Sequence, residues 1–515
     1  MWNVYPRPQL RRESFLNLNG KWFVNGEVSY VPKCESAEHI EYLRSFKLNK
    51  KNDRIILHIG AADQKAKVFL NNVFVANHEG GYLPFDIDIT DYVNEGENYI
   101  KIEVIDELDI NLPYGKQKKK HKGMWYTPTS GIWKSIWIEQ VPKIYIKDVK
   151  ITTDLQGADV TLFINDCRSW PDVKELTKEM RFDEKNPIIW DVDNPHLYYK
   201  TIEYEKDKIE IYYALRKIEI DEDSDGVKRV FLNNRPIFLH GILDQGYYKD
   251  GYLLPENPEE YEKDILKIKE LGFNMIRKHI KIEPEEFYYA CDRLGILVMQ
   301  DMVNSGKYHF FKDTVLGTLG FKFRDKCKTY NQRQQFWLDH TIETVKHLYN
   351  HPSVIAYTLF NEGWGQFDSD NIYDKVKQLD PTRLIDSTSG WFARKKSDFD
   401  SKHIYFNIKK LRPKKRPMII SECGGYTLNL SGTKKPYGYG KCLTEGELTY
   451  KILLMYRKMI QPGAIKGICG AVYTQFTDIE DEINGLYTFD RSICKVNKNQ
   501  MKDLAFNLGE DLWIQ

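Results

Sequence analysis

The sequence lacks long apolar runs, closely spaced cysteines and net charge. Nowhere in its 515 residues is there an uninterrupted apolar stretch long enough to cross a bilayer. The eight cysteines are scattered and never stand in CxxC spacing, which argues against a disulfide framework and against a zinc site. A formal net charge of +1 provides no global field for nucleic acid or an anionic membrane. We therefore expect neither nucleic acid nor a membrane as a partner.

The first residues, MWNVYPRPQLRRESF, lack an apolar segment behind a charged start, so no secretory signal is visible. Together with the scattered cysteines, this predicts a reducing, cytoplasmic location. One basic run, KQKKKHK at 116–122, is expected to be a solvated loop. Aromatic residues are plentiful, with 33 Tyr, 25 Phe and 11 Trp. Such side chains stack on sugar rings but also fill β-sandwich cores, and we expect most of them in cores.

The length predicts about three domains, and the first two are all-β. Residues 1–140 contain short β-branched segments such as RIILHIG (54–60) and YIKIEVID (99–106), separated by Asn and Gly turns. This pattern predicts a jelly-roll β-sandwich. Residues 141–228 continue with short strands and suit a small immunoglobulin-like β-sandwich.

In residues 229–515 the pattern changes to strands alternating with amphipathic helices, which is typical of a (β/α)₈ TIM barrel. The whole chain is therefore predicted to be a multidomain β and α/β protein. The barrel strands are expected at 235–243, 273–280, 296–302, 353–362, 383–389, 403–408, 417–424 and 468–478.

Two glutamates stand out at the carboxyl ends of these strands, where barrel enzymes collect their functional groups. Glu362 follows the apolar strand VIAYTLF, and Glu422 follows MII. Glycoside cleavage needs one protonated carboxyl that donates to the leaving oxygen and one ionised carboxylate, about 5–5.5 Å away when configuration is retained. Arg277 would help to separate their pKa values. The alternative is a structural salt bridge at the barrel mouth. Other polar residues at strand ends are Asp244, His279, Asp301, Asn361, Ser389, His403, Tyr473 and Gln475.

Several motifs have the order and spacing of a known family. GMWYTPTSGIWKSIWIE (123–139), FNEGWGQFD (360–368), IISECGG (419–425) and YTQFTDIEDEINGLYTFDR (473–491) are the most specific of them. With further matches over nearly the whole chain, the sequence resembles glycoside hydrolase family 2, the family of β-galactosidases, β-glucuronidases and β-mannosidases.

The resemblance implies a role for each residue at these motifs. Glu362 would be the general acid/base, Glu422 the nucleophile, and Asn361 the residue that holds the sugar 2-hydroxyl. Arg277 would lie beside Glu422 and keep it ionised. For Trp364 and Trp391, contact with the sugar and packing within a loop both stay open. The remaining residues expected at the sugar site are Asp244, His279, Asp301, Trp364, Trp391, His403, Tyr473 and Gln475.

The sequence also departs from the family pattern. Ile280 stands where many members have a histidine, and Cys423 where an aromatic residue is usual. Glucuronidases of the family carry an Asn and a Lys just before the glycine that corresponds to Gly485, whereas this chain has Glu482 and Asn484. A glucuronide is therefore a less favoured substrate, and a galactosidase-like activity is favoured.

We expect a retaining exo-β-glycoside hydrolase that forms a covalent glycosyl-enzyme and uses no metal ion or other cofactor. Its partner would be a carbohydrate, and because family members often form dimers or tetramers, a homo-oligomer stays open. The alternatives are a non-catalytic carbohydrate-binding pseudoenzyme and a transglycosylase that uses the same carboxylates. The long segment 303–334 could form a wall of the pocket.

Overall fold

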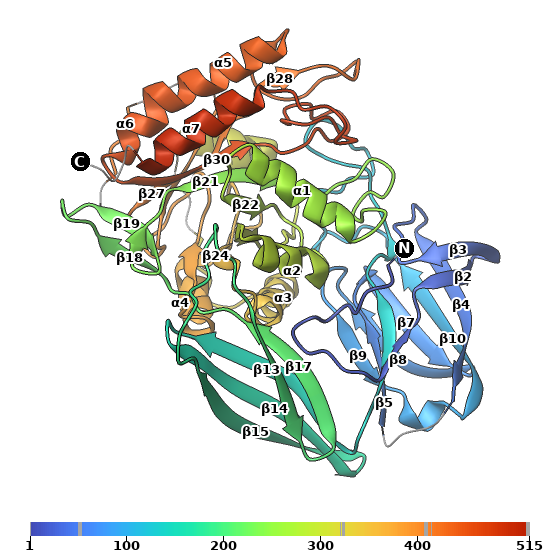
Figure 1. The fold of residues 1–515 in the computed structure, drawn as a ribbon. Helices are drawn as coiled ribbons and strands as arrows, with labels where there is room; N and C mark the ends of the chain where they lie inside the picture. The colour runs from blue at the N-terminus through green and yellow to red at the C-terminus, as the bar shows by residue number, and fades with distance from the viewer. Residues whose placement is uncertain are drawn as a thin grey trace.

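The computed structural model describes residues 2–49, 54–319, 321, 325–405, 410–413 and 415–510. The N-terminal part consists of two main antiparallel sheets (Figure 1). Side chains along strands β4 and β10 alternate between buried and exposed, because successive residues of a strand point to opposite faces. The larger sheet contains β2 (Gly20–Val24), β3 (Glu27–Val31), β4 (His39–Leu48), β7 (Lys65–Leu70), β8 (Val73–Glu79) and β10 (Gly96–Ile105). The other contains β1 (Phe15–Asn17), β5 (Arg54–Ile59), β9 (Phe85–Asp88) and β12 (Ile136–Val141).

The two sheets enclose a core of aliphatic side chains that includes Leu57, Val68 and Ile102. Short elements complete this part of the chain, namely β6 (Ala62–Asp63), η1 (Thr90–Tyr92) and β11 (Gly131–Ile132).

A second set of β-sheets follows directly in the chain. Its long central strand alternates buried and exposed residues, and Ile146, Leu162 and Ile209 belong to its separate apolar core. The strands are β13 (Ile144–Thr153), β14 (Gly157–Ser169), β15 (Asp172–Asp183), β16 (Tyr198–Tyr204) and β17 (Asp207–Tyr213). A small sheet of β18 (Ile218–Glu222), β19 (Lys228–Leu232) and β20 (Arg235–Pro236) leads into the last part of the chain.

The C-terminal part is an eight-stranded parallel sheet in the order β25-β24-β23-β22-β21-β30-β27-β26, which forms a nearly closed barrel. Every residue of β21, β22, β23, β24, β25, β27 and β30 is buried, as expected for parallel strands covered on both faces. The strands are β21 (Leu239–Asp244), β22 (Met275–Lys278), β23 (Leu297–Asp301), β24 (Val354–Thr358), β25 (Leu384–Asp386), β26 (Asp400–Ile404), β27 (Met418–Gly424) and β30 (Ile468–Thr474).

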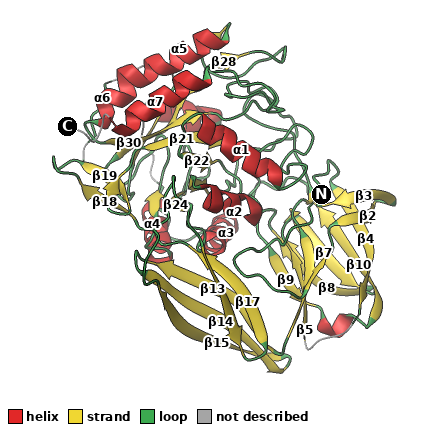
Figure 2. Ribbon diagram, viewed as in Figure 1, coloured by secondary structure: helices red, strands yellow, loops and turns green. Residues whose placement is uncertain are grey.

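Helices pack around this sheet (Figure 2). The helical segments are α1 (Glu259–Glu270), α2 (Glu285–Leu294), η2 (Phe310–Leu316), α3 (Gln332–Leu348), α4 (Ser369–Leu379), α5 (Glu445–Met455), η3 (Tyr456–Ile460), α6 (Gln461–Ala464) and α7 (Lys498–Glu510). A two-stranded sheet of β28 (Thr427–Leu428) and β29 (Lys441–Cys442) lies beside α5 in the chain. Within the described ranges, no helix combines the length and apolar character needed to cross a membrane.

The predicted fold class is confirmed, and each of the eight barrel strands forms where a strand was expected. The sixth strand begins three residues earlier than predicted, and 406–408 of its predicted range lie outside the described residues. The domain limits at 140 and 228 stay predictions.

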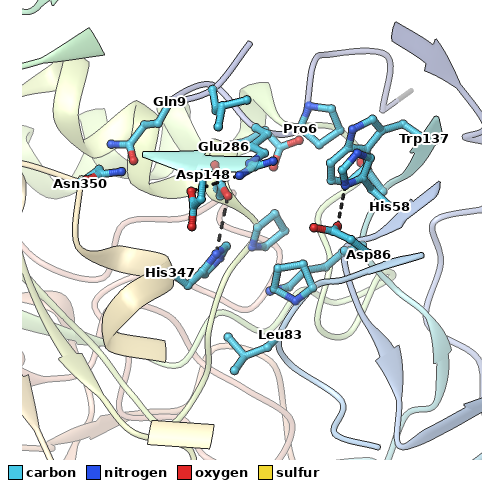
Figure 3. Close-up of a pocket in the computed structure, with 18 of the residues that line it drawn as sticks. Pro6, Gln9, His58, Leu83, Asp86, Trp137, Asp148, Glu286, His347 and Asn350 are labelled. Carbon is cyan, nitrogen blue, oxygen red and sulfur yellow. Dashed lines mark hydrogen bonds and ion pairs between the residues drawn. The ribbon is translucent and has the colours of Figure 1, made fainter. Parts of the chain in front are cut away.

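A large polar pocket lies where the three parts of the chain meet (Figure 3). It is lined by His58 and Asp86 from the first β-sandwich, Asp148 from the second, and Glu286 and His347 from the barrel helices. None of the predicted site residues lines it. The charged groups are therefore part of the contact between domains. One of them, Glu286, makes stability depend on pH.

Replacing Glu286 with glutamine should stabilise the protein at alkaline pH. Burial raises the pKa of Glu286 from 4.5 to about 8, and one of its carboxyl oxygens has no hydrogen-bond partner within the described chain. Between these two pH values the unfolded chain has lost a proton that the folded one keeps, so stability falls as the pH rises through this window. We expect Glu286→Gln to gain about 1–2 kcal/mol near pH 8.5 and little near pH 4, measured by denaturant unfolding.

Glu343→Gln is the matched control for this experiment. Glu343 lines the same pocket, but it is exposed and pairs with Lys346 at 2.8 Å. An equal gain from both variants at alkaline pH would contradict the assignment to Glu286.

Candidate active site

Glu422 lies on β27 inside the barrel mouth and is 5% exposed. Its Oε1 accepts a hydrogen bond from Arg277 Nη1 at 3.1 Å and lies 3.5 Å from His403 Nε2. Burial alone would raise the pKa of Glu422, but the neighbouring side chains of His403 and Arg277 outweigh this effect and lower it to about 2. The carboxyl group is therefore ionised at neutral pH.

Arg277 on β22 is fully buried and holds three other residues of the site in place. Its guanidinium group donates to Asp301 Oδ1 at 3.0 Å, to Asn361 Oδ1 at 2.9 Å and to Glu422 at 3.1 Å. A planar group with several fixed donors suits this task better than a flexible ammonium group. Because Asn361 uses its oxygen for this bond, the NH₂ group of its amide is directed away from the guanidinium.

Glu362 follows β24 in an uncommon backbone conformation, with φ of 53°. Its backbone N–H donates to Ser389 O at 3.0 Å, and Ser389 N donates to Phe360 O at 2.8 Å. These bonds tie the end of the fourth strand to the chain that follows the fifth. On its side chain, Oε1 lies 2.8 Å from His403 Nδ1. The backbone of Glu362 is thus fixed by the hydrogen bonds with Ser389, and its carboxyl group by the contact with His403.

His403 bridges the two glutamates. Its ring is fully buried and lies between Glu362 on one nitrogen and Glu422 on the other. The register of β26 with β27 is irregular between Lys402 and His403, and such irregularities redirect side chains at functional sites. One oxygen from each glutamate and one ring nitrogen of His403 all lie within 4.8 Å of one another. This spacing is close to the separation of about 5–5.5 Å that a retaining pair needs.

The same three residues also form the one group in the described chain whose donor atoms are close enough to hold a metal ion. Two carboxylates and an imidazole suit a divalent cation, but they are equally the components of the acid/base pair described above. The expectation that no metal is used stays a prediction.

Tyr405, which the sequence analysis did not select, donates a hydrogen bond from its hydroxyl group to Glu422 Oε2. Its ring stacks on Tyr439 with the centroids 4.1 Å apart. Residues at i and i+2 at a strand end share a face, so the position two residues after His403 could have pointed to Tyr405. Tyr439 comes from a distant loop, and no sequence pattern places it here.

A small pocket adjoins Glu362 and Asn361. Its other lining residues come from the first β-sandwich and from the loops after β23 and β24, namely Lys116, Met124, Trp125, Tyr308 and Trp364. The indole N–H of Trp364 donates to Gly306 O at 2.8 Å, and its ring packs edge-on against Trp125 at 5.1 Å. Trp364 therefore both packs under the loop and lines the pocket, and Tyr308 of segment 303–334 lines it as well.

Trp391 packs against the backbone near Glu362. Its indole N–H donates to Asp313 O at 2.6 Å and lies 3.2 Å from Glu362 O. Gly317 lies so close that a Cβ there would meet the Trp391 ring at 2.1 Å. Trp391 thus connects η2 and its neighbours to the loop that carries Glu362.

Three of the predicted site residues, His279, Asp301 and Asp244, contact other polar groups of the protein. His279 Nδ1 lies 2.6 Å from Asp301 Oδ2, and burial lowers the pKa of His279 to about 4. Asp244 forms an ion pair with the buried Lys278 and accepts from Gly246 N at 2.9 Å. Both carboxylates are therefore occupied by protein donors.

The predicted residues at the eighth strand, Tyr473 and Gln475, are enclosed by other residues of the protein. Tyr473 is fully buried and packs under Gly424, where the φ of 81° and the 2.3 Å that would separate a Cβ from this ring require glycine. Gln475 is held between Gln245, at 2.6 Å, and Asn484, at 2.9 Å. The structure shows no contact of either with Glu362 or Glu422 among the hydrogen bonds and ion pairs of the described residues.

The departures from the family pattern also have defined surroundings. Cys423 is fully buried with its thiol directed to Val472 O at 3.3 Å, so it is a packed thiol. Glu482 accepts hydrogen bonds from Tyr126 and from Asn484 Nδ2, the latter at 3.1 Å. The carboxylate of Glu482 therefore joins the barrel to the first β-sandwich.

Two family models match this chain. "Glycosyl hydrolases family 2, TIM barrel domain" covers residues 225–501, and "Glycosyl hydrolases family 2, sugar binding domain" covers residues 18–142. The first alone spans more than half of the chain. The protein therefore belongs to glycosyl hydrolase family 2.

Proteins similar to this chain include β-galactosidases and β-glucuronidases. A β-galactosidase of Thermoanaerobacter pseudethanolicus is 28% identical over 51% of this chain and 39% of its own length. A putative β-glucuronidase of Formosa agariphila is 25% identical over 65% of this chain and 42% of its own length. The matched regions thus span about two fifths of these relatives. Among solved structures, the β-D-glucuronidase of Dictyoglomus thermophilum matches this chain with a TM-score of 0.73, and the match covers 98% of both chains. The two sequences are 19% identical, so this match shows a shared fold.

Proposed function

We propose that this protein is a retaining exo-β-glycoside hydrolase that works by double displacement. The observation that carries the proposal is the closeness of the two glutamates, with oxygens within 4.8 Å, in a setting that gives them different environments. Glu422 lies against the guanidinium of Arg277, whereas Glu362 has no such contact among the described residues. A pair of carboxyl groups with unequal surroundings is what acid/base and nucleophilic roles require.

In the first step, the ionised Glu422 attacks the anomeric carbon as the bond to the leaving oxygen breaks. Glu362 gives its proton to that oxygen, and a covalent glycosyl-enzyme forms. In the second step, Glu362 takes a proton from water, which attacks the anomeric carbon and releases Glu422. The NH₂ group of Asn361 is available to donate to the sugar 2-hydroxyl, and Tyr405 and Arg277 orient the nucleophile.

The proposal also concerns which sugar is cleaved. A galactosidase-like activity is favoured because Glu482 and Asn484 stand where glucuronidases of the family carry Asn and Lys. Relatives named β-galactosidase and relatives named β-glucuronidase both match this chain, so glucuronides belong in the same test as galactosides. We propose a cytoplasmic location on a separate ground, because all eight cysteines are free thiols.

A mechanism-based 2-fluoro glycoside tests the proposal. Its fluorine slows both steps, whereas its activated leaving group keeps the first step fast enough to proceed, so we expect the glycosyl-enzyme to accumulate on Glu422, detected by peptide mass spectrometry. The sugar for the reagent is chosen from a panel of nitrophenyl β-galactoside, β-glucoside, β-mannoside, β-glucuronide and α-L-arabinoside. Turnover without any adduct on Glu422 would reject the assignment. No turnover and no adduct with any sugar would favour a carbohydrate-binding pseudoenzyme.

Transglycosylation uses the same residues and differs only in the acceptor. Product analysis at high concentrations of a sugar or alcohol acceptor separates it from hydrolysis, because the glycosyl-enzyme then partitions between water and the added hydroxyl group.

A further inference from the structure

Lys116 is the first residue of the basic run and is only half-buried, unlike Lys118, Lys119 and Lys120, which are exposed. The prediction of a solvated loop therefore holds for Lys118, Lys119 and Lys120 but not for Lys116. Lys116 lines the pocket beside Glu362 and Asn361. The first β-sandwich thus brings a positive charge to the candidate active site of the barrel.

The backbone around Lys116 is fixed by contacts on both sides. Lys116 O accepts from Tyr126 N at 2.9 Å within the first β-sandwich. Two residues before it, Tyr114 N donates to Asn304 O at 3.1 Å and the Tyr114 hydroxyl donates to Gly306 O at 3.0 Å, both in the barrel. On the other side, Gln117 is buried and its Oε1 accepts from Thr129 N at 2.6 Å. The position of Lys116 is therefore set by the docking of the two domains.

The ammonium group of Lys116 has no carboxylate oxygen within 4.0 Å in the part of the chain that the structure describes. Its charge nevertheless reaches the site, because it is one of the charges that lower the pKa of Glu422. Nearby, Lys118 lies over the ring of Trp125, with 5.3 Å between its nitrogen and the ring centroid. Trp125 lines the same pocket. The pocket thus has an aromatic wall, an unpaired cation inside and a second cation above that wall.

Neutral sugars are bound through hydroxyl groups and need no unpaired cation. A carboxylate or sulfate on the substrate would supply the missing partner, since charge-assisted hydrogen bonds to such groups are the strong ones. The pocket includes Glu362, which faces the leaving oxygen in the proposed function, and does not include Glu422. The cation therefore lies beside the proposed acid/base, which protonates the departing group.

We propose that Lys116 binds an anionic group on the substrate, and that the preferred substrates are β-glycosides whose departing part is acidic. This inference rests on the proposed function and adds a specificity residue to it. An acid on the cleaved sugar itself would offer the same chemistry, so the test separates these two positions.

The test compares matched pairs of substrates. The first pair is the 4-carboxyphenyl and 4-carbamoylphenyl β-glycosides of the sugar that the panel selects, which differ in the charge of the departing group. The second pair is a nitrophenyl β-glycoside and the corresponding uronide, which differ in the charge of the cleaved sugar. We expect Lys116→Gln to lower kcat/KM for the acidic member of the first pair by about tenfold, with little effect on the neutral member. Comparing wild type with variant cancels differences in leaving-group reactivity.

Two further variants control for side effects. Lys119→Gln removes an equal charge from the same loop, but Lys119 is exposed and pairs with Glu38, so its selectivity should match that of wild type. Lys116→Arg keeps the charge and should recover part of the preference. Because the interaction is electrostatic, the preference of wild type should also weaken as the salt concentration rises.

Each outcome decides the inference. A loss confined to the acidic aryl glycoside supports it as stated, and a loss confined to the uronide places the anion on the cleaved sugar instead. Equal effects of Lys116→Gln on both members of both pairs would overturn it while leaving the proposed function intact. If wild type cleaved none of these compounds, the proposed function would fail. Calorimetric binding of the same pairs to wild type and Lys116→Gln would then decide whether the anion is bound.

Discussion

Glu422→Gln is expected to abolish turnover, with kcat/KM falling by roughly four orders of magnitude or more. The carboxylate is the proposed nucleophile, and an amide cannot form the glycosyl-enzyme. The fold should survive, because Gln has nearly the same shape and Arg277 keeps Asp301 and Asn361 as partners. The measurement is the initial rate on the best nitrophenyl glycoside, together with thermal unfolding.

The matched control is Glu447→Gln, a half-buried glutamate that pairs with Lys451 on α5. It changes the same chemical group far from the barrel mouth and should leave the rate as in wild type. A wild-type rate for Glu422→Gln on every glycoside that the protein cleaves would show that another group is the nucleophile.

Glu362→Ala is expected to slow the protein by an amount that depends on the leaving group. For substrates with alkyl or sugar leaving groups, which need a proton as the bond breaks, we expect a loss of roughly 10²- to 10⁴-fold. For a dinitrophenyl glycoside, whose leaving oxygen needs no proton, formation of the glycosyl-enzyme should be nearly unaffected. The measurement is kcat/KM over a series of aryl glycosides of increasing phenol pKa.

Azide provides a second readout for the same variant. It needs no base to attack the glycosyl-enzyme, so it should speed turnover of Glu362→Ala and yield a β-glycosyl azide, the product of net retention. Glu422→Gln should give no such product. If the loss in Glu362→Ala were the same for all leaving groups and azide had no effect, Glu362 would not be the acid/base.

Much of the fold could be predicted from local patterns. Apolar runs such as VIAYTLF and MII identify parallel strands because both faces of such a strand are buried. Residues at the ends of these strands must meet at the barrel mouth, which is why Glu362, Glu422 and Arg277 could be selected from the sequence. Tyr405 could have been selected by the same reasoning, from its place two residues after His403.

Contacts between distant loops could not be predicted in this way. Lys116, Trp125 and Tyr439 reach the site from segments whose conformations depend on how the domains pack. Asp244 and Gln475 illustrate the converse, since their strand-end positions were correct but buried protein partners occupy their polar groups. Whether a polar side chain faces a ligand or another residue depends on those partners, and sequence spacing does not contain them.

The two carboxylates at the barrel mouth and the fold that brings them together were determined by the sequence alone, because strand periodicity places side chains by local rules. The tertiary structure decided what surrounds that pair. It placed His403 between the glutamates, Tyr405 on Glu422, and the unpaired charge of Lys116 beside Glu362. These arrangements depend on domain docking and loop closure, in which residues far apart in the chain come within hydrogen-bonding distance.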